Sequence, residues 1–241
     1  MNIDLLAFGA HPDDTELGCS GTIASLVKRG KKVVVVDLTR GEMGSRGSAE
    51  LRKQEATNAS KILGLHDRVN LGLPDTELQN TREFQLPIIQ AVRQFRPKIC
   101  FVPPQVDRHP DHGKASRLIL DALFYSGLIK IETTGTNGMV QEPHRPQHIL
   151  HYLLATPFEP DFVFNISDTI GIKEEAIQAF SSQFDVKDPG DEPNTFVSDP
   201  SFFEMLRARA RQYGHQAGFE YGEPFKVYGG PIGIQDFDFL K

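Results

Sequence analysis

The chain has 241 residues, of which 39% are hydrophobic, and its formal net charge is -6 at pH 7. Its acidic and basic residues are mixed along the sequence, which excludes the basic stripe that nucleic-acid binding requires, and no apolar run approaches the roughly 20 residues that span a bilayer. Because Asp4 interrupts the first apolar segment, no cationic and apolar leader opens the chain, and we expect a cytoplasmic protein that contacts neither membrane nor nucleic acid.

Strand and helix patterns alternate in the first part of the chain. Short apolar runs predict strands over residues 3–9, 32–38, 69–73 and 99–102. Apolar residues at helical spacing, with glycine closing two of the segments, predict helices over residues 18–29, 48–63, 85–95 and 114–125. This alternation is typical of right-handed crossovers between strands. We therefore expect a Rossmann-like α/β fold with a mostly parallel sheet and helices on both faces.

The pattern is weaker beyond residue 130. We predict strands over 148–156 and 162–166, helices over 172–180 and 202–213, and a loop over 185–200. The arginines of the last helix are expected on a solvated face, and Cys19 and Cys100 are expected as small buried hydrophobes. One hydrophobic core can organise a chain of this length. We therefore predict a single domain over 1–241, in which residues 1–130 form the core and residues 131–241 complete the pocket.

Chemically rich segments directly follow four of the predicted strands. They cover residues 11–16, 39–46, 74–77 and 107–112. Ligands of open parallel sheets bind beyond the carboxyl ends of the strands, so we expect these loops to converge on one active site at that edge.

Two of these segments contain the tripeptide His-Pro-Asp, at His11 and at His109. A single such tripeptide is an ordinary turn, because proline fixes φ and aspartate accepts local hydrogen bonds. Two of them at corresponding strand ends are not explained by turn formation. Imidazole nitrogens and carboxylate oxygens are ligands that zinc and ferrous iron accept, and three protein ligands leave a position open for water. The pattern predicts a catalytic metal centre.

A dinucleotide-binding domain is the main alternative, since it also begins with a strand, a turn and a helix. Its turn must present backbone N–H groups to a pyrophosphate. Here Pro12 lacks an N–H group, and Asp13 and Asp14 would repel phosphates. Asp37 stands near the position of a ribose-binding acid, but a cap or turn explains it equally well. We reject this alternative.

The motifs resemble those of a known family. Ala10 to Asp14, followed by Glu16 and Gly18, is similar to the opening signature of the zinc-dependent sugar N-deacetylases, the PIG-L or LmbE-like family, and residues 109–112 are similar to its second motif. Residues 182–184, 208–214 and 221–225 resemble the bacillithiol-biosynthesis deacetylases. Those enzymes release acetate from N-acetylglucosaminyl malate and give glucosaminyl malate.

The resemblance implies roles for individual residues. His11, Asp14 and His112 would bind the metal, either zinc or ferrous iron. Asp13 would be the general base that takes a proton from the water on the metal. His109 would stabilise the oxyanion as a cation and later protonate the leaving amine. These roles meet the chemical needs of amide hydrolysis, and a further carboxylate, that of Asp111, is placed to orient an imidazole.

Substrate contacts are expected from residues in the surrounding loops: Arg52, Asp75, Arg108 and Glu42. Arg52 suits an acidic aglycone, because a guanidinium binds a carboxylate through two N–H groups, but it could equally pair with Glu55 on a helix surface. Asp75 is equally explained as a turn former, and Glu42 lies in a glycine-rich loop that is either a lid or a flexible turn. Further histidines are interpreted as surface or core residues: His144, His148, His151 and His215.

The leading interpretation is a deacetylase whose partner is a small acidic N-acetylglucosaminide. A deacetylase of another acetylated amino sugar, or an amide hydrolase of a thiol conjugate, is the second interpretation. A metal-binding or carbohydrate-binding protein without catalysis is the third, although simple metal binding requires neither Asp13 nor His109. Members of the family tend to form trimers or pairs of trimers, so the resemblance also implies a homo-oligomer, either trimer or hexamer.

Overall fold

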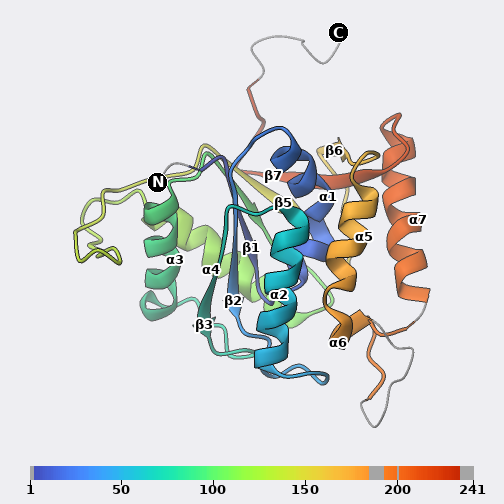
Figure 1. Ribbon diagram of the computed structural model, residues 1–241. Coiled ribbons are helices and arrows are strands. Elements are labelled where there is room, and N and C mark those ends of the chain that lie inside the picture. The colour runs from blue at the N-terminus through green and yellow to red at the C-terminus, as the bar shows by residue number, and fades with distance from the viewer. Residues whose placement is uncertain (1–2, 185–192, 200, 234–241) are drawn as a thin grey trace.

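The computed structural model describes residues 3–184, 193–199 and 201–233 of the chain. These residues form a seven-stranded sheet with the order β3-β2-β1-β4-β5-β7-β6, shown in Figure 1. Its strands are β1 (Leu5–Gly9), β2 (Val33–Thr39), β3 (Asp67–Leu73), β4 (Ile99–Val102), β5 (His148–Tyr152), β6 (Phe162–Asn165) and β7 (Gly222–Tyr228).

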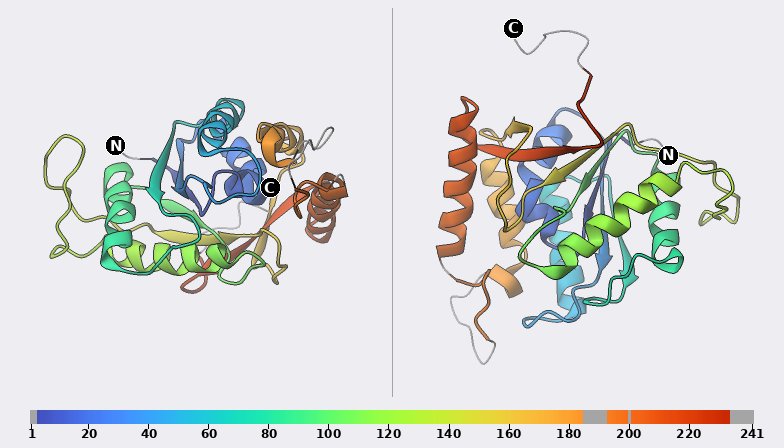
Figure 2. Two further views of the ribbon diagram at one scale, coloured as in Figure 1. Left: turned by 90° about the horizontal axis from the view of Figure 1, so that it is seen from below. Right: turned by 180° about the vertical axis from the view of Figure 1, so that it is seen from behind.

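Helices cover both faces of this sheet, as Figure 2 shows. The helices are α1 (Asp14–Lys28), α2 (Ala49–Leu63), α3 (Arg82–Phe95), α4 (Pro110–Tyr125), α5 (Ile170–Gln178), α6 (Ser181–Phe184) and α7 (Ser201–Gln216). Helices α1, α2 and α5 pack together on one face, α3 and α4 pack on the other, and α7 lies against β7. Within the described residues, no helix combines the length and apolar character that crossing a bilayer requires.

Strand β1 is the centre of the parallel part of the sheet, because it pairs in parallel with β2 on one side and with β4 on the other. Its side chains alternate between two cores: Leu6 and Phe8 pack with the α3 and α4 side, and Leu5 and Ala7 with the α1 side. The chain leaves β1 towards one face and β4 towards the other. Such a reversal opens a crevice at the carboxyl ends of the two strands, which is where α/β proteins bind ligands.

The predicted fold class is confirmed, with one strand missed. Strands β3, β2, β1, β4 and β5 are parallel, whereas β7 is antiparallel to both of its neighbours. We did not predict β7, because Gly222, Glu223 and Pro224 interrupt any apolar pattern and are poor strand formers. The predicted strand over 148–156 is shorter than expected and ends at Tyr152.

The two helices that carry predicted metal ligands begin earlier than their apolar patterns indicate. Helix α1 starts at Asp14 and not at Gly18, and α4 starts at Pro110 and not at Lys114. The early turns carry polar, chemically active residues that do not contribute to an apolar stripe, so a hydrophobic periodicity cannot detect them. As a result, Asp14 and His112 lie in first helical turns.

Two predictions on the C-terminal part concern the loop over 185–200 and the basic helix. Residues 193–199 of that loop contain turns, and the others lie outside the described residues. Arg207 and Arg211 are exposed and pair with acidic residues, as a solvated face requires. The prediction is wrong for Arg209, which is partly buried and donates to the carbonyl oxygen of Leu154. Cys19 and Cys100 are buried free thiols, as expected.

Candidate active site and metal centre

Asp13 joins β1 to α1 in a strained backbone conformation. Its φ of 124° and ψ of -23° are rare for any residue other than glycine, and such strain is concentrated at functional sites. Asp13 directly precedes α1, yet its side chain makes no capping hydrogen bond to the helix. The carboxylate instead lies 3.2 Å from Nη1 of Arg52. Helix capping, the ordinary structural role of an aspartate at this position, therefore does not explain Asp13.

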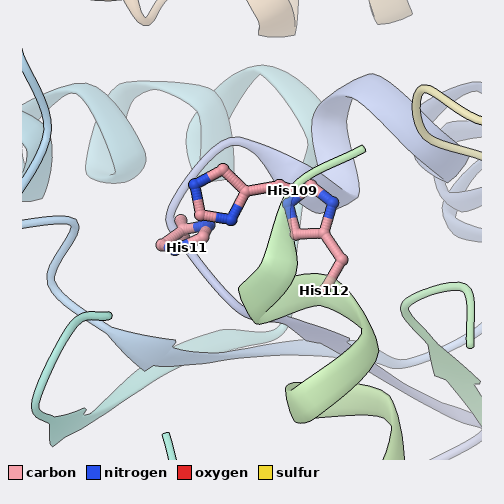
Figure 3. A group of neighbouring side chains, drawn as sticks. All are labelled: His11, His109 and His112. Atoms are coloured by element: carbon pink, nitrogen blue, oxygen red, sulfur yellow. The ribbon is translucent and has the colours of Figure 1, made fainter. Parts of the chain in front are cut away.

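His109 and His112 come from the start of α4 on the other side of the crevice. Pro110 opens the helix, where its fixed φ suits the first turn, and the backbone N–H of Asp111 donates to Nδ1 of His109 at 3.3 Å. The ring centroid of His11 lies 4.8 Å from that of His109 and 5.6 Å from that of His112. Figure 3 shows the three imidazoles gathered at the helix start.

Asp14 lies between the two histidines that we predicted as its fellow ligands. Its Oδ1 is 3.1 Å from Nε2 of His112, and its Oδ2 is 3.6 Å from Nδ1 of His11. The backbone N–H of His11 also donates to Asp14 Oδ2 at 3.0 Å, which fixes the carboxylate against the turn.

Each of these imidazoles is held by another carboxylate at its second nitrogen. Asp107 Oδ2 lies 2.5 Å from Nδ1 of His112, and Asp75 Oδ1 lies 3.1 Å from Nε2 of His11. Asp111 Oδ2 also approaches Nε2 of His11, at 3.6 Å. A carboxylate on the far nitrogen of a histidine fixes its ring and tautomer in metal sites and makes the other nitrogen a better ligand. Asp111, which we expected to orient an imidazole, thus lies near His11, and Asp75 contacts the same nitrogen.

Asp107 is the residue that our sequence analysis missed. It lies in the segment after β4, and its other oxygen accepts from the backbone N–H groups of Ala155 and Thr156 at 2.9 and 2.6 Å. It lies five positions before His112, a spacing that fits no regular helical or strand pattern. The only available signal was that Asp107 is an acid that directly follows a buried strand near a histidine motif.

The donor set fits a divalent metal. His11, Asp14 and His112 each direct a nitrogen or oxygen towards the others, and such borderline ligands suit zinc or ferrous iron. Two groups of potential ligand atoms in the described residues lie within 4.8 Å of one another: His11, His109 and His112, and His11, Asp75 and Asp111; Asp14 belongs to neither group. A metal bound by the second group would use Nε2 of His11, which already contacts Asp75. A metal bound beside Asp14 would use Nδ1 of His11 and would leave the contact between Nε2 and Asp75 intact.

The carboxylates and imidazoles of the centre shift one another's pKa values. Burial lowers the pKa of His112, but Asp14 and Asp107 outweigh it and raise that pKa to about 9. The pKa of His11 is likewise raised well above its ordinary value, because carboxylates oppose the effect of burial. Burial raises the pKa of Asp14, but the two histidines prevail and hold it well below the ordinary range. The cluster therefore has an excess of carboxylates that attracts positive charge.

Arg52 is buried beside the candidate general base and does not lie on a helix surface. Its Nη1 donates to Pro12 O at 3.1 Å and to Asp13 at 3.2 Å, so the alternative pairing with Glu55 is wrong. Glu55 instead accepts from Ser182. Burial raises the pKa of Asp13 to about 7, although Arg52 acts in the opposite direction. A carboxylate that titrates near neutrality suits a general base.

The remaining predicted contacts differ in how close they come to the centre. Glu42 is exposed and accepts from the backbone N–H of Asp75 at 3.1 Å, which ties the glycine-rich loop to the site. Asp75 also accepts from Met43 N at 3.0 Å, so its oxygens are already engaged. Arg108 is exposed, and its guanidinium lies 4.5 Å from the ring centroid of Phe196. The loops after β1, β2, β3 and β4 thus converge, as predicted.

The other histidines lie away from the metal-ligand candidates. His144 contacts Pro97 O at 2.7 Å, before β5 begins, and His148 is the first residue of that strand, at the opposite end from the site. His151 is buried and contacts Pro103 O at 2.7 Å. His215 is exposed near the end of α7. Asp37, the acid considered for ribose binding, forms a buried ion pair with Arg68 at 2.7 Å.

A sequence model of the family described as GlcNAc-PI de-N-acetylase (PIG-L) matches residues 6–123, which include both His-Pro-Asp motifs. The diacetylchitobiose deacetylase of Thermococcus kodakarensis is 30% identical over 236 residues, which is 94% of this chain and 83% of that protein. A Bacillus subtilis protein named "Probable N-acetyl-alpha-D-glucosaminyl L-malate deacetylase 2" is 28% identical over 197 residues, or 76% of this chain and 84% of that protein.

A solved structure of similar fold is the conserved protein TT1542 from Thermus thermophilus. It superposes with a TM-score of 0.85 and 40% sequence identity, and the match covers 97% of this chain and 98% of that one. The similarity therefore extends over the C-terminal part as well as over the segment that carries the motifs.

Proposed function

The chain belongs to the GlcNAc-PI de-N-acetylase (PIG-L) family, and from this premise we propose that it is a metal-dependent hydrolase that removes the N-acetyl group of an N-acetylglucosamine glycoside. The substrate that we propose first is N-acetylglucosaminyl malate, which gives glucosaminyl malate and acetate. One observation carries the proposal: His11 and His112 each turn one nitrogen towards Asp14 while a carboxylate holds the other. Asp13 stands beside this group as a base.

His11, Asp14 and His112 would hold the cation, with zinc and ferrous iron both acceptable to this donor set. When bound there, the cation would polarise the amide carbonyl and lower the pKa of the attacking water. Simple metal binding needs no strained aspartate next to a ligand. The conformation of Asp13 therefore favours catalysis over the interpretation as a binding protein.

Asp13 is the group that we propose to accept the proton of the attacking water. The C–O bond forms as this proton moves to the carboxylate. The proton is then delivered to the amine nitrogen as the C–N bond breaks, so charge and protons balance. Arg52 holds one oxygen of Asp13 at 3.2 Å and thereby sets the direction of the other. In this scheme Arg52 is a positioning residue, and its contact with substrate is no longer required.

The second predicted catalytic residue, His109, has a different role in this scheme from the one that we expected. Burial, together with His11 and His112, lowers the pKa of His109, so the imidazole is neutral near pH 7. Its Nδ1 accepts the N–H of Asp111, which assigns the proton to Nε2. A neutral His109 can therefore donate through Nε2 to the oxygen that becomes negative during attack. This proposal replaces the cationic histidine that we expected.

Diacetylchitobiose is the second candidate substrate, and two observations favour it. The relative named for that substrate matches more of this chain than the malate-type relative does. In addition, Arg52 is engaged by Pro12 and Asp13, and Arg108 lies over the ring of Phe196, so both arginines of our predicted contacts already have partners within the chain. Homo-oligomer formation, the single domain and the cytoplasmic location stay predictions.

Acetate release from N-acetylglucosaminyl malate, diacetylchitobiose and free N-acetylglucosamine would test the proposal. Purified enzyme would be assayed with quantified metal, beside an Asp67→Asn variant as a matched exposed-carboxylate control. We expect the highest kcat/KM on the malate conjugate, with the control unchanged. Preference for diacetylchitobiose would select the second candidate. Release from none of the three by metal-loaded protein would refute the proposal.

A further inference from the structure

A second cavity lies between α2 and the edge strand β3, outside the catalytic centre. Its volume is about 870 Å³, within the roughly 300–1,000 Å³ of small-molecule sites. In Figure 1, β3 forms one edge of the sheet and α2 lies in front of the sheet face. The lining contains no metal-ligand candidate and reaches the catalytic turn only at Pro12. A ligand in this cavity would therefore occupy a site of its own.

Gly41 packs closely against two residues that lie next to the catalytic turn. A Cβ atom placed on Gly41 would lie 3.1 Å from Nη1 of Arg52 and 3.6 Å from Cδ of Pro12. Gly41 has a φ of 67°, a conformation that glycine adopts without strain. Pro12, Gly41 and Arg52 thus pack closely together beside Asp13, and of these three residues only Pro12 lines the cavity.

The end of the cavity next to Pro12 carries two cations, Arg40 and Lys53. Both side chains are exposed, and neither forms an ion pair with any described residue. Two acids of the lining lie near them in the chain, Asp37 and Glu50; because Arg68 pairs with Asp37, the two cations outnumber the one remaining acid. Unpaired cations around a concave surface focus the electric field and attract anions.

Hydroxyl groups follow these cations along α2. Thr57 Oγ1 donates to Lys53 O at 2.9 Å, and Ser60 Oγ donates to Ala56 O at 2.7 Å. Because both hydroxyl hydrogens are used within the helix, the oxygens remain as acceptors on the cavity wall. Sugar hydroxyls are the natural donors for such a wall.

The floor of the cavity is rigid and partly apolar. Arg68 is held there by Asp37 at 2.7 Å and by Glu16 at 2.6 Å, and its side chain is only 8% exposed. Its N–H groups are all directed to these carboxylates and to Ala56 O. Leu65 and Leu71 add apolar surface. The guanidinium of Arg68 thus has no free N–H for an anion, and the exposed cations of the lining are Arg40, Lys53 and Lys61.

We propose that this cavity is a second ligand site, for an anionic sugar such as a sugar phosphate or a uronic acid. The anionic group contacts Arg40 and Lys53, and the sugar hydroxyls donate to Thr57 and Ser60. Lys61 lines the other end of the cavity, eight residues further along α2 and so about 12 Å away at 1.5 Å per residue. It provides a matched control within the same cavity. The proposal is independent of the catalytic function proposed above.

Calorimetric titration of the metal-loaded protein with glucose 6-phosphate, glucuronate and glucose tests this site. We expect binding of an anionic sugar and none of glucose. Tighter binding of glucose 6-phosphate would identify a phosphate ligand, and tighter binding of glucuronate a uronic acid. Arg40→Gln and Lys53→Gln should each weaken binding about tenfold, the value of one charge-assisted contact, whereas Lys61→Gln should change it less than about twofold.

Three results would overturn the proposal. The first is the absence of binding of either anionic sugar to the wild type. The second is an equal loss of affinity in Lys53→Gln and Lys61→Gln, which would indicate unspecific attraction by surface charge. The third is a loss of binding in Asp14→Ala, which would place the anion at the catalytic centre. Failure of deacetylase activity alone would affect none of these measurements.

Discussion

Two regions of the molecule bury charged side chains, and they differ in the kind of cation that pairs with each carboxylate. Beside α1, Arg68 pairs with Glu16 and Asp37, and Lys173 pairs with Glu223 at 2.6 Å. Each carboxylate there has a permanently charged partner, and we call this the balanced region. At the candidate catalytic centre, Asp14, Asp75 and Asp107 pair with the imidazoles of His11 and His112, which a metal cation can occupy in place of protons, and we call this the unbalanced region.

The balanced region fixes the position of α1 through hydrogen bonds to its backbone. Glu223 accepts from the backbone N–H groups of Gly21 and Thr22, at 3.0 and 2.7 Å, in the middle of α1. Lys173 donates to the carbonyl oxygens of Glu16 and Leu17, at 3.3 and 2.7 Å, in the first turns of the same helix. Buried charge is costly to desolvate unless every group is paired. Closed ion pairs thus position α1, and we propose that the unbalanced cluster at its start performs the chemistry.

Asp13→Asn gives the largest expected effect and separates catalysis from metal binding. The amide keeps the shape of the side chain but cannot accept a proton at neutral pH. We expect kcat/KM to fall roughly 10²–10⁴-fold, the usual contribution of a general base, with bound metal unchanged. Steady-state kinetics and metal analysis of the same sample would show this. A loss of metal together with activity would mean that Asp13 is itself a ligand.

Lys173→Met tests the balanced region. Removal of the lysine leaves Glu223 as a buried unpaired charge, and breaking such a pair costs about 3–5 kcal/mol of unfolding free energy. Chemical denaturation would measure the loss, and the metal affinity of the folded fraction should stay close to that of the wild type. The double variant Lys173→Met, Glu223→Gln should recover part of the stability. No recovery would mean that packing of the lysine, and not charge balance, is what stabilises α1.

Asp107→Asn acts on the unbalanced region through His112. The amide cannot hold the imidazole as strongly as the carboxylate, and loss of such an outer partner typically weakens metal binding about 10–100-fold. Competition with a chromogenic chelator would measure the change. Asp67→Asn, an exposed carboxylate that lines the second cavity, serves as the control. Unchanged metal affinity would place His112 outside the metal site.

Arg207→Gln gives the smallest expected effect. Its guanidinium pairs with Glu174 at 2.6 Å but is largely exposed, with 51% of the side chain accessible. Exposed ion pairs contribute about 0–1 kcal/mol, so thermal unfolding should shift little and activity should not change. A loss comparable to that of Lys173→Met would contradict the distinction between buried and exposed pairs.

The sequence predicted the parts of the site that are local in the chain. The two His-Pro-Asp tripeptides follow buried strands, and the parallel sheet brings strand ends to one edge. Contacts between distant residues were not accessible in this way. The pairing of Arg52 with Asp13 depends on how α2 packs against the turn, and a helical pattern cannot distinguish it from a surface pair. The choice of His11, Asp14 and His112 as metal ligands stays a prediction.

The same limit explains the missed strand. Glu223 looks like a surface residue in a turn-rich segment, because an isolated charge gives no hydrophobic pattern. Its burial is possible only because Lys173 and the amides of α1 meet it from elements far away in the sequence. Strand β7 is thus defined by long-range pairing with β5 and β6, and local preference opposes it.

The place of β7 in the sheet also affects how the chain folds during its synthesis. Among the described strands, β6 pairs with β7 alone, although it is synthesised almost 60 residues earlier. While the ribosome is still adding that stretch, β5 presents an unpaired edge, and α1, among the first elements to emerge, lacks its carboxylate partner. Folding can finish only once Glu223 has left the exit tunnel. A nascent chain arrested before that point should bind chaperones that recognise exposed strand edges.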